Sequence, residues 1–238
     1  MEQPRVLKYV QRKLEQYWSP DQIAGRAKQV EFRRQADRWP SRSTIYSWLN
    51  HPYRGGAAWK SYLRFANKRQ RRQENEEKAS ISIRDRPVVV DRRHRYGDWE
   101  GDTVVGPKHQ SAIVTVVDRK SGYLLTRKAR DRKSSTVCQA IGQQFRELSL
   151  TVRKTITVDN GTEFSDHQRL AAVTHMNVYF ALPYCSWQRG TNENTNGLIR
   201  QFFPKGTDFR NVPSEKIRHI KNLLNNRPRK RHGYKTPH

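Results

Sequence analysis

The spacing of apolar residues changes once along this chain, and the change constrains the fold more than any other feature. Between residues 6 and 65, apolar side chains recur at intervals of three and four, which is the period of one helix face. From residue 98 onward, short segments alternate apolar and polar residues, which is the period of a β-strand. The change marks two modules, so we predict an all-α N-terminal module followed by an α/β domain.

The N-terminal module is predicted to contain three short helices. The second begins after Ser19, a good N-cap, with Pro20 at the first helical position and Gln22 as the capping-box partner. The third begins near residues 41–43 and ends before Pro52, because the residue before a proline disfavours helix. Three short helices of this kind are typical of a helix-turn-helix.

A helix-turn-helix would use its third helix to read DNA. The polar residues that this helix would present outward are Arg42, Ser43, Thr44, Tyr46 and Ser47. Arginine binds guanine or phosphate, and hydroxyls bond phosphates and base edges, so we predict DNA binding here. The connection over residues 31–40 is longer than the three- or four-residue turn of the usual motif. A small helical bundle without DNA contacts therefore stays open as an alternative.

The α/β domain is predicted from the order of its segments. Its strands are expected at 98–105, 112–117, 123–129, 155–158 and 178–182, and its helices at 134–148, 168–174, 191–203 and 214–225. Three strands followed by alternating helices and strands is the order of elements in the ribonuclease-H-like fold. We therefore predict a mixed sheet with flanking helices.

These patterns divide the chain into four parts. We expect a helix-turn-helix module over 1–65, a basic linker over 66–95, a ribonuclease-H-like α/β domain over 96–226 and a basic tail over 227–238. For the tail, contact with DNA and a disordered, solvated segment are equal alternatives.

The balance of charges indicates the class of partner. The chain has 47 Lys and Arg against 22 Asp and Glu, a net charge of +25 at pH 7, which favours a nucleic-acid partner. A ribosomal-type or merely basic protein is the alternative. No apolar run approaches the ~20 residues of a membrane span, and residues 1–18 lack the apolar segment of a secretory signal. Two cysteines cannot form a disulfide framework, and the eight histidines show no zinc-finger spacing. We expect a protein of a reducing compartment, without membrane contact or structural zinc.

Carboxylates stand in three short, glycine-flanked segments of this basic chain: 97–106, 155–164 and 190–200. In the first, strand alternation puts Asp98, Glu100 and Asp102 on one face, and spacing does not choose among them. Asp159 follows a strand at the sheet edge where α/β folds bind ligands, and Glu193 lies in the first turns of a helix. Each has a simpler structural explanation alone, but together they predict a Mg²⁺ site.

Two basic residues follow the last of these carboxylates. Arg200 lies about two helical turns after Glu193, on the same face, where it would hold a phosphate beside the metal site. Lys205 is a second candidate for contact with DNA phosphates.

Several longer motifs resemble one family. They are residues 99–102 (WEGD), residues 158–164 (VDNGTEF), and the run over 183–206 that ends in WQRGTNENTNGLIRQFFPKG. With residues 18–26 (WSPDQIAGR) and 44–46 (TIY), they resemble transposases of the insertion-sequence-thirty family, in the DDE transposase and integrase group. The resemblance implies that Asp102, Asp159 and Glu193 form the catalytic, metal-binding triad, and so selects Asp102 over Asp98 and Glu100.

The resemblance also implies a reaction. Two Mg²⁺ ions, or Mn²⁺, would serve phosphoryl transfer that cuts the terminal inverted repeats of an element and joins their 3′-hydroxyls to target DNA. The resemblance further implies assembly on paired ends as at least a homodimer, in the bacterial cytoplasm and in association with the nucleoid. The family usually carries a further N-terminal DNA-binding segment and continues beyond a Thr-Pro like that at 236–237, so we expect a shortened copy. The alternatives are a non-catalytic DNA-binding repressor or remnant, and a ribonuclease acting on RNA–DNA hybrids.

Overall fold

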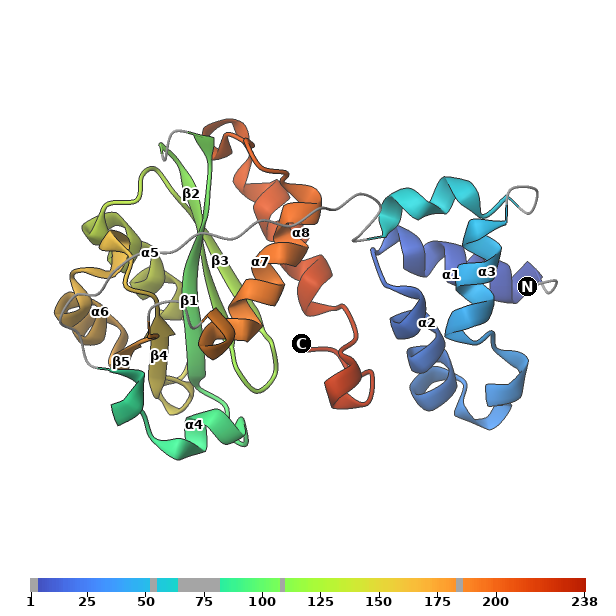
Figure 1. Ribbon diagram of the computed structural model, residues 1–238, viewed down its shortest axis with the longest axis horizontal. Coiled ribbons are helices and arrows are strands. Elements are labelled where there is room, and N and C mark those ends of the chain that lie inside the picture. The colour runs from blue at the N-terminus through green and yellow to red at the C-terminus, as the bar shows by residue number, and fades with distance from the viewer. Residues whose placement is uncertain (1–3, 52–54, 64–81, 108–109, 183–185) are drawn as a thin grey trace. The chain divides into compact units, whose positions relative to one another are not determined.

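The computed structural model describes residues 4–51, 55–63, 82–107, 110–182 and 186–238 (Figure 1). It divides the chain into two compact units, Met1–Arg71 with Leu223–His238, and Arg72–Asn222. The first part of the predicted linker, up to residue 81, lies outside the described residues. Among the helices that the structure describes, none has the length and apolar character needed to cross a membrane.

The first unit contains α1 (Pro4–Glu15), α2 (Pro20–Arg26) and α3 (Arg42–Asn50) (Figure 1). The predicted capping box at the start of α2 is confirmed. The Ser19 side chain accepts a hydrogen bond from Gln22 N, and Gln22 Oε1 accepts one from Ser19 N at 2.9 Å. The sequence pattern therefore indicated both the start and the inward face of these helices correctly.

The long connection between α2 and α3 is held by aromatic packing. A π-helical turn (Ala27–Glu31) extends α2, and a 3-10 helix (Arg33–Arg38) follows. Phe32 stacks on Trp39 with ring centroids 4.1 Å apart, and Tyr9 of α1 packs edge-on against Trp39. The insertion is thus anchored to the same core as the helices, and α3 remains packed on α2.

The second unit is built on a five-stranded mixed sheet of order β3-β2-β1-β4-β5. Its strands are β1 (Asp98–Val105), β2 (Ala112–Asp118), β3 (Leu124–Ala129), β4 (Thr155–Val158) and β5 (Asn177–Phe180). The first three pair antiparallel, whereas β4 and β5 continue the sheet parallel to β1. The predicted ribonuclease-H-like mixed sheet is confirmed.

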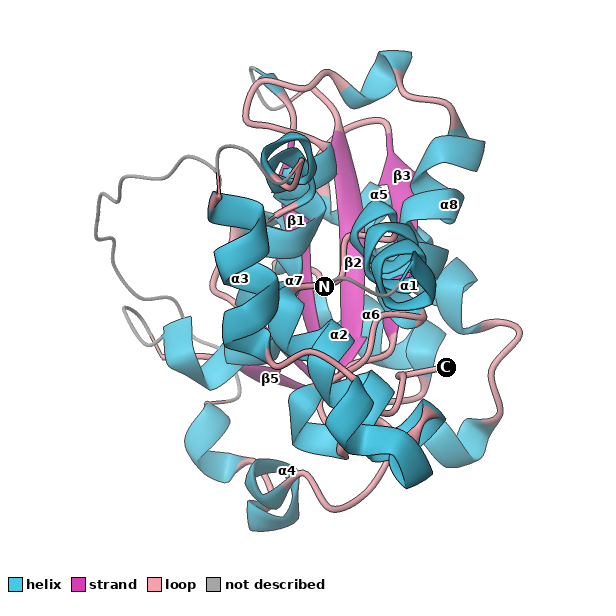
Figure 2. Cartoon of the chain, turned by 90° about the vertical axis from the view of Figure 1, so that its right-hand side faces the viewer, coloured by secondary structure: helices cyan, strands magenta, loops and turns pink. Residues whose placement is uncertain are grey.

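The two faces of the sheet differ in polarity. Helices α5 (Ser134–Phe145) and α6 (His167–Thr174) cover the apolar face, which buries Trp99, Val114 and Ile156. Helix α7 (Gly190–Phe202) packs on the other side of β1 and β2, and α8 (Ser214–Asn225) follows it in the chain (Figures 1 and 2). Because strand side chains alternate, the even-numbered residues of β1 face α7.

Residues 82–95 differ from the predicted linker. They form a 3-10 turn (Ile83–Asp85) and α4 (Val88–Arg92), and they pack on the sheet of the second unit. Arg86, 6% exposed, donates from Nη1 to Thr157 Oγ1 at 2.8 Å, and Val90 is fully buried. Side-chain hydrogen bonds fix this segment, and apolar periodicity does not reveal such bonds.

The last residues of the chain also have defined structure. A 3-10 helix (Lys230–His232) is closed by a bridge between Arg229 and Lys235, and Tyr234 is 7% exposed. The structure therefore disagrees with one of the two alternatives for the tail, a disordered and solvated segment.

Candidate active site

Two of the three carboxylates on β1 are buried and hydrogen-bonded to neighbouring residues. Asp98, 1% exposed, accepts two hydrogen bonds from Arg95, at 2.8 and 3.0 Å, and one from Thr155 Oγ1 at 2.9 Å. Glu100, fully buried, accepts from Arg119 Nη1 at 2.6 Å and from the Asn192 backbone N–H at 2.8 Å. Neither side chain has an open coordination position toward solvent.

The third carboxylate, Asp102, lies level with Asp159. Strands β1 and β4 are parallel neighbours with Glu100 opposite Thr157, and two further residues of this register bring Asp102 beside Asp159. Both therefore stand at the carboxyl end of adjacent parallel strands, where α/β sheets place their ligands. Their side chains are 22% and 37% exposed.

Arg189 joins these two carboxylates. Its Nη1 lies 3.2 Å from Asp102 Oδ2, and its Nη2 lies 3.0 Å from Asp159 Oδ2. The Arg189 side chain is 13% exposed, so its charge is largely shielded from water. Sequence reasoning assigned no role to Arg189, although it falls within the run that carries the family resemblance. It immediately precedes α7, and only the fold brings it to the sheet edge.

Further contacts orient the two aspartates. Asp102 accepts from Thr103 N at 2.7 Å and from Asn196 Nδ2 at 3.0 Å. Asp159 accepts from Gly161 N at 3.0 Å, in the turn that the Asn-Gly pair makes after β4. Burial, opposed by Arg189 and reinforced by the charge of Asp159, raises the pKa of Asp102 to about 6. Two like charges at close range thus share one guanidinium.

Glu193 lies on α7, the helix that packs on β1 and β2. Asn192, fully buried, donates from Nδ2 to the Glu100 carbonyl at 2.8 Å, and Asn196 accepts from Thr115 Oγ1 at 2.9 Å. These contacts fix α7 on β1 and β2. Glu193 lies three residues before Asn196, and residues with this spacing share a helix face.

The structure brings Asp102 and Asp159 together but leaves Glu193 exposed. Within the described ranges, no three His, Cys, Asp or Glu side chains are grouped closely enough to hold a metal ion. The observed cluster is therefore a pair of aspartates with a bound guanidinium, and Glu193 lies on α7 outside it.

One buried carboxylate was not anticipated. Glu163, 2% exposed, accepts from Thr103 Oγ1 at 3.0 Å and forms an ion pair with Arg132. Burial opposes its ionisation, but the bonds from Arg132 and Thr103 prevail and hold the pKa of Glu163 below its usual value. The segment after Asp159 included Glu163, but only the fold shows that it supports Thr103, the neighbour of Asp102.

The predicted phosphate ligands take different positions. Arg200 donates from Nη2 to the Val105 carbonyl at 2.7 Å and from Nη1 to the Pro204 carbonyl at 3.3 Å, and burial lowers its pKa. It is thus bonded to backbone oxygens at the end of β1 and just after α7, whereas Lys205 is exposed. In the first unit, the five residues of α3 that were predicted to face outward and bind DNA are all exposed: Arg42, Ser43, Thr44, Tyr46 and Ser47.

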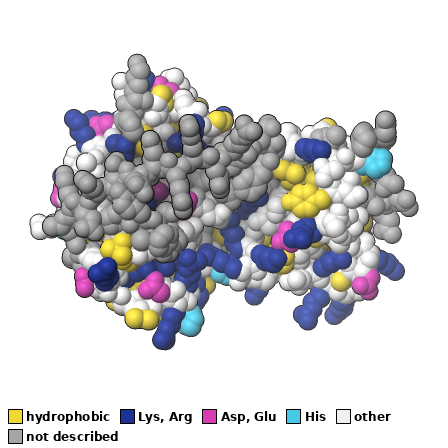
Figure 3. All heavy atoms as spheres, viewed as in Figure 1, with side chains coloured by type: hydrophobic (Ala, Val, Ile, Leu, Met, Phe, Trp, Pro, Cys, Tyr) yellow, Lys and Arg dark blue, Asp and Glu magenta, His cyan; other side chains and the backbone are white. Residues whose placement is uncertain are grey.

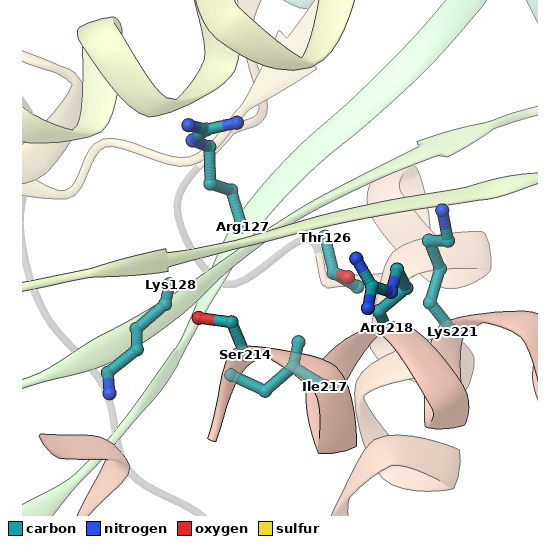
Figure 4. Close-up of a pocket in the computed structure, with 7 residues that line it drawn as sticks. All are labelled: Thr126, Arg127, Lys128, Ser214, Ile217, Arg218 and Lys221. Carbon is teal, nitrogen blue, oxygen red and sulfur yellow. The ribbon is translucent and has the colours of Figure 1, made fainter. Parts of the chain in front are cut away.

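A basic pocket of about 340 Å³ lies apart from the carboxylates, between β3 and α8. Figure 4 shows Arg218 and Lys221 rising from α8 beside Thr126, with Arg127 on the opposite side of the strand. Lys128 Nζ is engaged by the carbonyls of residues 210 and 212, at 3.0 and 3.1 Å. Lysine and arginine side chains are also spread over the described parts of the face in Figure 3.

Comparison with known proteins places this chain in a family. The integrase core domain family matches residues 92–186. A transposase for insertion sequence element IS4351 of Bacteroides fragilis is 38% identical over 98% of this chain and 72% of its own length. Transposase InsI for insertion sequence element IS30C of Escherichia coli is 39% identical over 97% of this chain and 62% of its own length. The chain thus spans less than two thirds of the second relative.

Among solved structures, the HTLV-2 integrase catalytic core domain in complex with magnesium (dimeric form) is 23% identical, with a TM-score of 0.44. That alignment covers 59% of this chain and 92% of the other. The sequence relatives are the stronger finding, because one is 38% identical and is spanned over more than two thirds of its length. The chain therefore belongs to the insertion-sequence-thirty family of DDE transposases.

Proposed function

We propose that this chain cuts DNA at the ends of an insertion element and joins the freed 3′-hydroxyls to target DNA. The catalytic groups are Asp102, Asp159 and Glu193, and the chain acts as an oligomer on paired ends. The observation that carries the proposal is the pair of aspartates at the carboxyl ends of β1 and β4, close enough to share Arg189.

The aspartate pair fits a divalent metal ion. Carboxylate oxygens are the ligands that Mg²⁺ prefers, and Mg²⁺ uses few protein carboxylates together with substrate phosphates. Burial is the main cause of the raised pKa of Asp102, and the neighbouring charge of Asp159 adds to it, so a bound cation would favour the ionised carboxylate. When bound, two such ions would activate the attacking oxygen and stabilise the leaving oxygen of an in-line displacement.

The protein residues supply position and charge. Asp102 and Asp159 would hold the metal from the sheet, and Glu193 would complete the ligand set from α7. Asn196 fixes the Asp102 carboxylate by its hydrogen bond of 3.0 Å. Lys205 and Arg42 of α3 would hold DNA phosphates, and Arg200 would do so after exchanging a carbonyl contact for a phosphate oxygen.

The test is nicking of plasmid DNA that carries the flanking ends of the element, with and without Mg²⁺. Asp159→Asn and Glu193→Gln remove one charge each and are expected to lose cleavage while still binding DNA. The control Glu147→Gln removes the same charge from an exposed position and should cut like wild type. Cleavage by Asp159→Asn at the wild-type rate would contradict the proposal.

A second candidate is a DNA-binding repressor that does not cut. It is favoured by two observations: Arg189 already pairs with both aspartates, and the described residues show no three-carboxylate group. In the same assay it predicts equal binding of the ends by wild type, Asp159→Asn and Glu193→Gln, with no metal-dependent nicks in any of them.

A further inference from the structure

The C-terminal segment 227–234 packs against α2 within the first unit. Gln22 Nε2 donates to the Pro228 carbonyl at 2.6 Å, and Gln22 Oε1 accepts from Arg227 Nε at 2.8 Å. One helical turn later, Arg26 Nη1 donates to the Tyr234 carbonyl at 3.0 Å. Two side chains on one face of α2 therefore hold the backbone of the segment at both of its ends.

The ring of Tyr234 is seated on a glycine. A Cβ atom at Gly25 would lie 2.0 Å from Tyr234 Cζ, so this seat accepts no larger residue without displacing the ring. Tyr234 is 7% exposed, and its hydroxyl donates to Asp21 Oδ2 at 3.3 Å. Its φ of +62° is a left-handed conformation that a tyrosine rarely adopts, which indicates that packing and hydrogen bonds impose it.

This packing brings a cation of the segment beside a cation of α3. Lys230 Nζ lies 3.8 Å from Asp21 Oδ2, and Arg42 Nη1 lies 4.0 Å from Asp21 Oδ1. Two cations thus share one carboxylate and leave a net positive charge. Their side chains are 71% and 63% exposed, and exposed pairs of this kind contribute at most about 1 kcal/mol. A phosphate can therefore attract both cations away from Asp21.

We propose that the segment 227–234 is part of the DNA-binding surface, and that Lys230 and Arg42 bind phosphates of one stretch of duplex DNA. The inference rests on the proposed function only for the identity of the ligand as DNA. The start of α3 would face base edges, as recognition helices do, and Lys230 would add a backbone contact that fixes its register. The DNA-binding surface then includes both α3 and the segment 227–234, and it is larger than α3 alone would provide.

The first experiment measures binding of duplex DNA with the element end by the full chain over a series of salt concentrations. Lys230→Gln should lower the magnitude of the slope of log K against log salt by about 0.9, and weaken binding about fivefold near 0.15 M salt. Lys8→Gln is the matched control, because Lys8 is exposed on α1 and lies outside this surface. Equal effects of the two variants would overturn the proposal, because general charge would then explain them.

The second experiment tests whether the packing of Tyr234 on Gly25 positions Lys230. Tyr234→Ala should release Lys230 and reproduce the effect of Lys230→Gln, whereas Tyr234→Phe keeps the ring and most of the affinity. The double variant Lys230→Gln with Tyr234→Ala should be no weaker than either single variant, because both remove one contact. Wild-type affinity of Tyr234→Ala, with a melting curve that shows a folded chain, would overturn the proposal.

Metal-dependent nicking of the same DNA separates this inference from the proposed function. If wild type never cuts but Lys230→Gln still lowers the salt slope, the catalytic proposal fails and this inference stands. If wild type cuts at the ends and Lys230→Gln binds like wild type, this inference fails alone.

Discussion

At the scale of single residues, Asp102 carries its charge where the fold disfavours it. Burial, opposed by Arg189 and reinforced by Asp159, raises its pKa from 3.8 to about 6. The folded chain therefore binds the Asp102 proton more tightly than the unfolded chain does. The contribution of Asp102 to the free energy of unfolding is therefore present below pH 4 and is lost as the pH rises toward 6.

We expect Asp102→Asn to stabilise the metal-free chain above pH 6. A difference of about two pKa units corresponds to about 3 kcal/mol, and asparagine carries no charge to be disfavoured. Urea unfolding of both proteins at pH 4.5 and 7.5 checks this expectation, since most of the gain should develop between these values. An equal gain at both values would show that packing, and not charge, is responsible.

Arg189 competes with a metal ion for the same two carboxylates. It lies 3.2 Å from Asp102 and 3.0 Å from Asp159, so a divalent ion between them must displace its guanidinium. We expect Arg189→Gln to bind Mn²⁺ on the order of tenfold more tightly without DNA, which corresponds to ~1.4 kcal/mol of removed repulsion. Calorimetric titration of the metal measures this directly.

The matched control is Arg200→Gln, which removes the same charge from α7. Arg200 contacts backbone carbonyls and neither aspartate, so its replacement should change metal affinity much less. Unchanged affinity in Arg189→Gln would mean that the guanidinium does not occupy the metal position.

At the scale of elements, the packing of α7 on the sheet depends on hydrogen bonds from buried asparagine side chains. Asn192 is fully buried, donates to the Glu100 carbonyl and accepts from Thr115 Oγ1 at 3.1 Å. We expect Asn192→Ala to lower the free energy of unfolding by about 2–3 kcal/mol, because buried partners lose their hydrogen bonds. The neighbouring Asn194→Ala changes an exposed residue of the same helix and should stay within about 0.5 kcal/mol. Urea unfolding compares the two, and equal losses would contradict this account of α7.

Elements with apolar periodicity were predictable from the sequence, and elements held by polar contacts were not. The strands 98–105 and 155–158 and the helix 214–225 have the predicted bounds, because alternation and the helical period record which faces are buried. Residues 82–95 and 227–234 were expected to be a linker and a tail. Their packing depends on hydrogen bonds such as Arg86 to Thr157, and these have no period.

The candidate site shows the same division. Strand alternation placed three carboxylates on one face of β1, and no rule of spacing separates them. Arg95 binds Asp98 and Arg119 binds Glu100, and these pairings depend on tertiary contacts across the fold. The resemblance to a family favoured Asp102, and the contacts of its neighbours supply a physical reason for that choice.

At the scale of the whole molecule, a net charge of +25 means that many cations have no carboxylate to pair with. A surface where such cations gather can bind phosphate. The pocket between β3 and α8 is such a surface. Its lining includes Arg127, Arg218 and Lys221, and within the described residues none of them forms an ion pair with a carboxylate. Three such cations around one cavity attract phosphate, and no feature of the pocket distinguishes one base sequence from another.

We therefore expect the double variant Arg218→Gln with Lys221→Gln to weaken binding of the element end and of random duplex DNA by the same factor. Two lost phosphate contacts should reduce the salt slope by about 1.8, because each contact contributes about 0.9. The double variant Arg84→Gln with Lys133→Gln removes equal charge from exposed positions of the same unit and should change the slope less. A loss confined to the element end would contradict this view, because phosphate contacts carry no sequence information. A uniform loss would instead assign this pocket to general DNA attraction and leave discrimination of the end to α3 and the contacts around it.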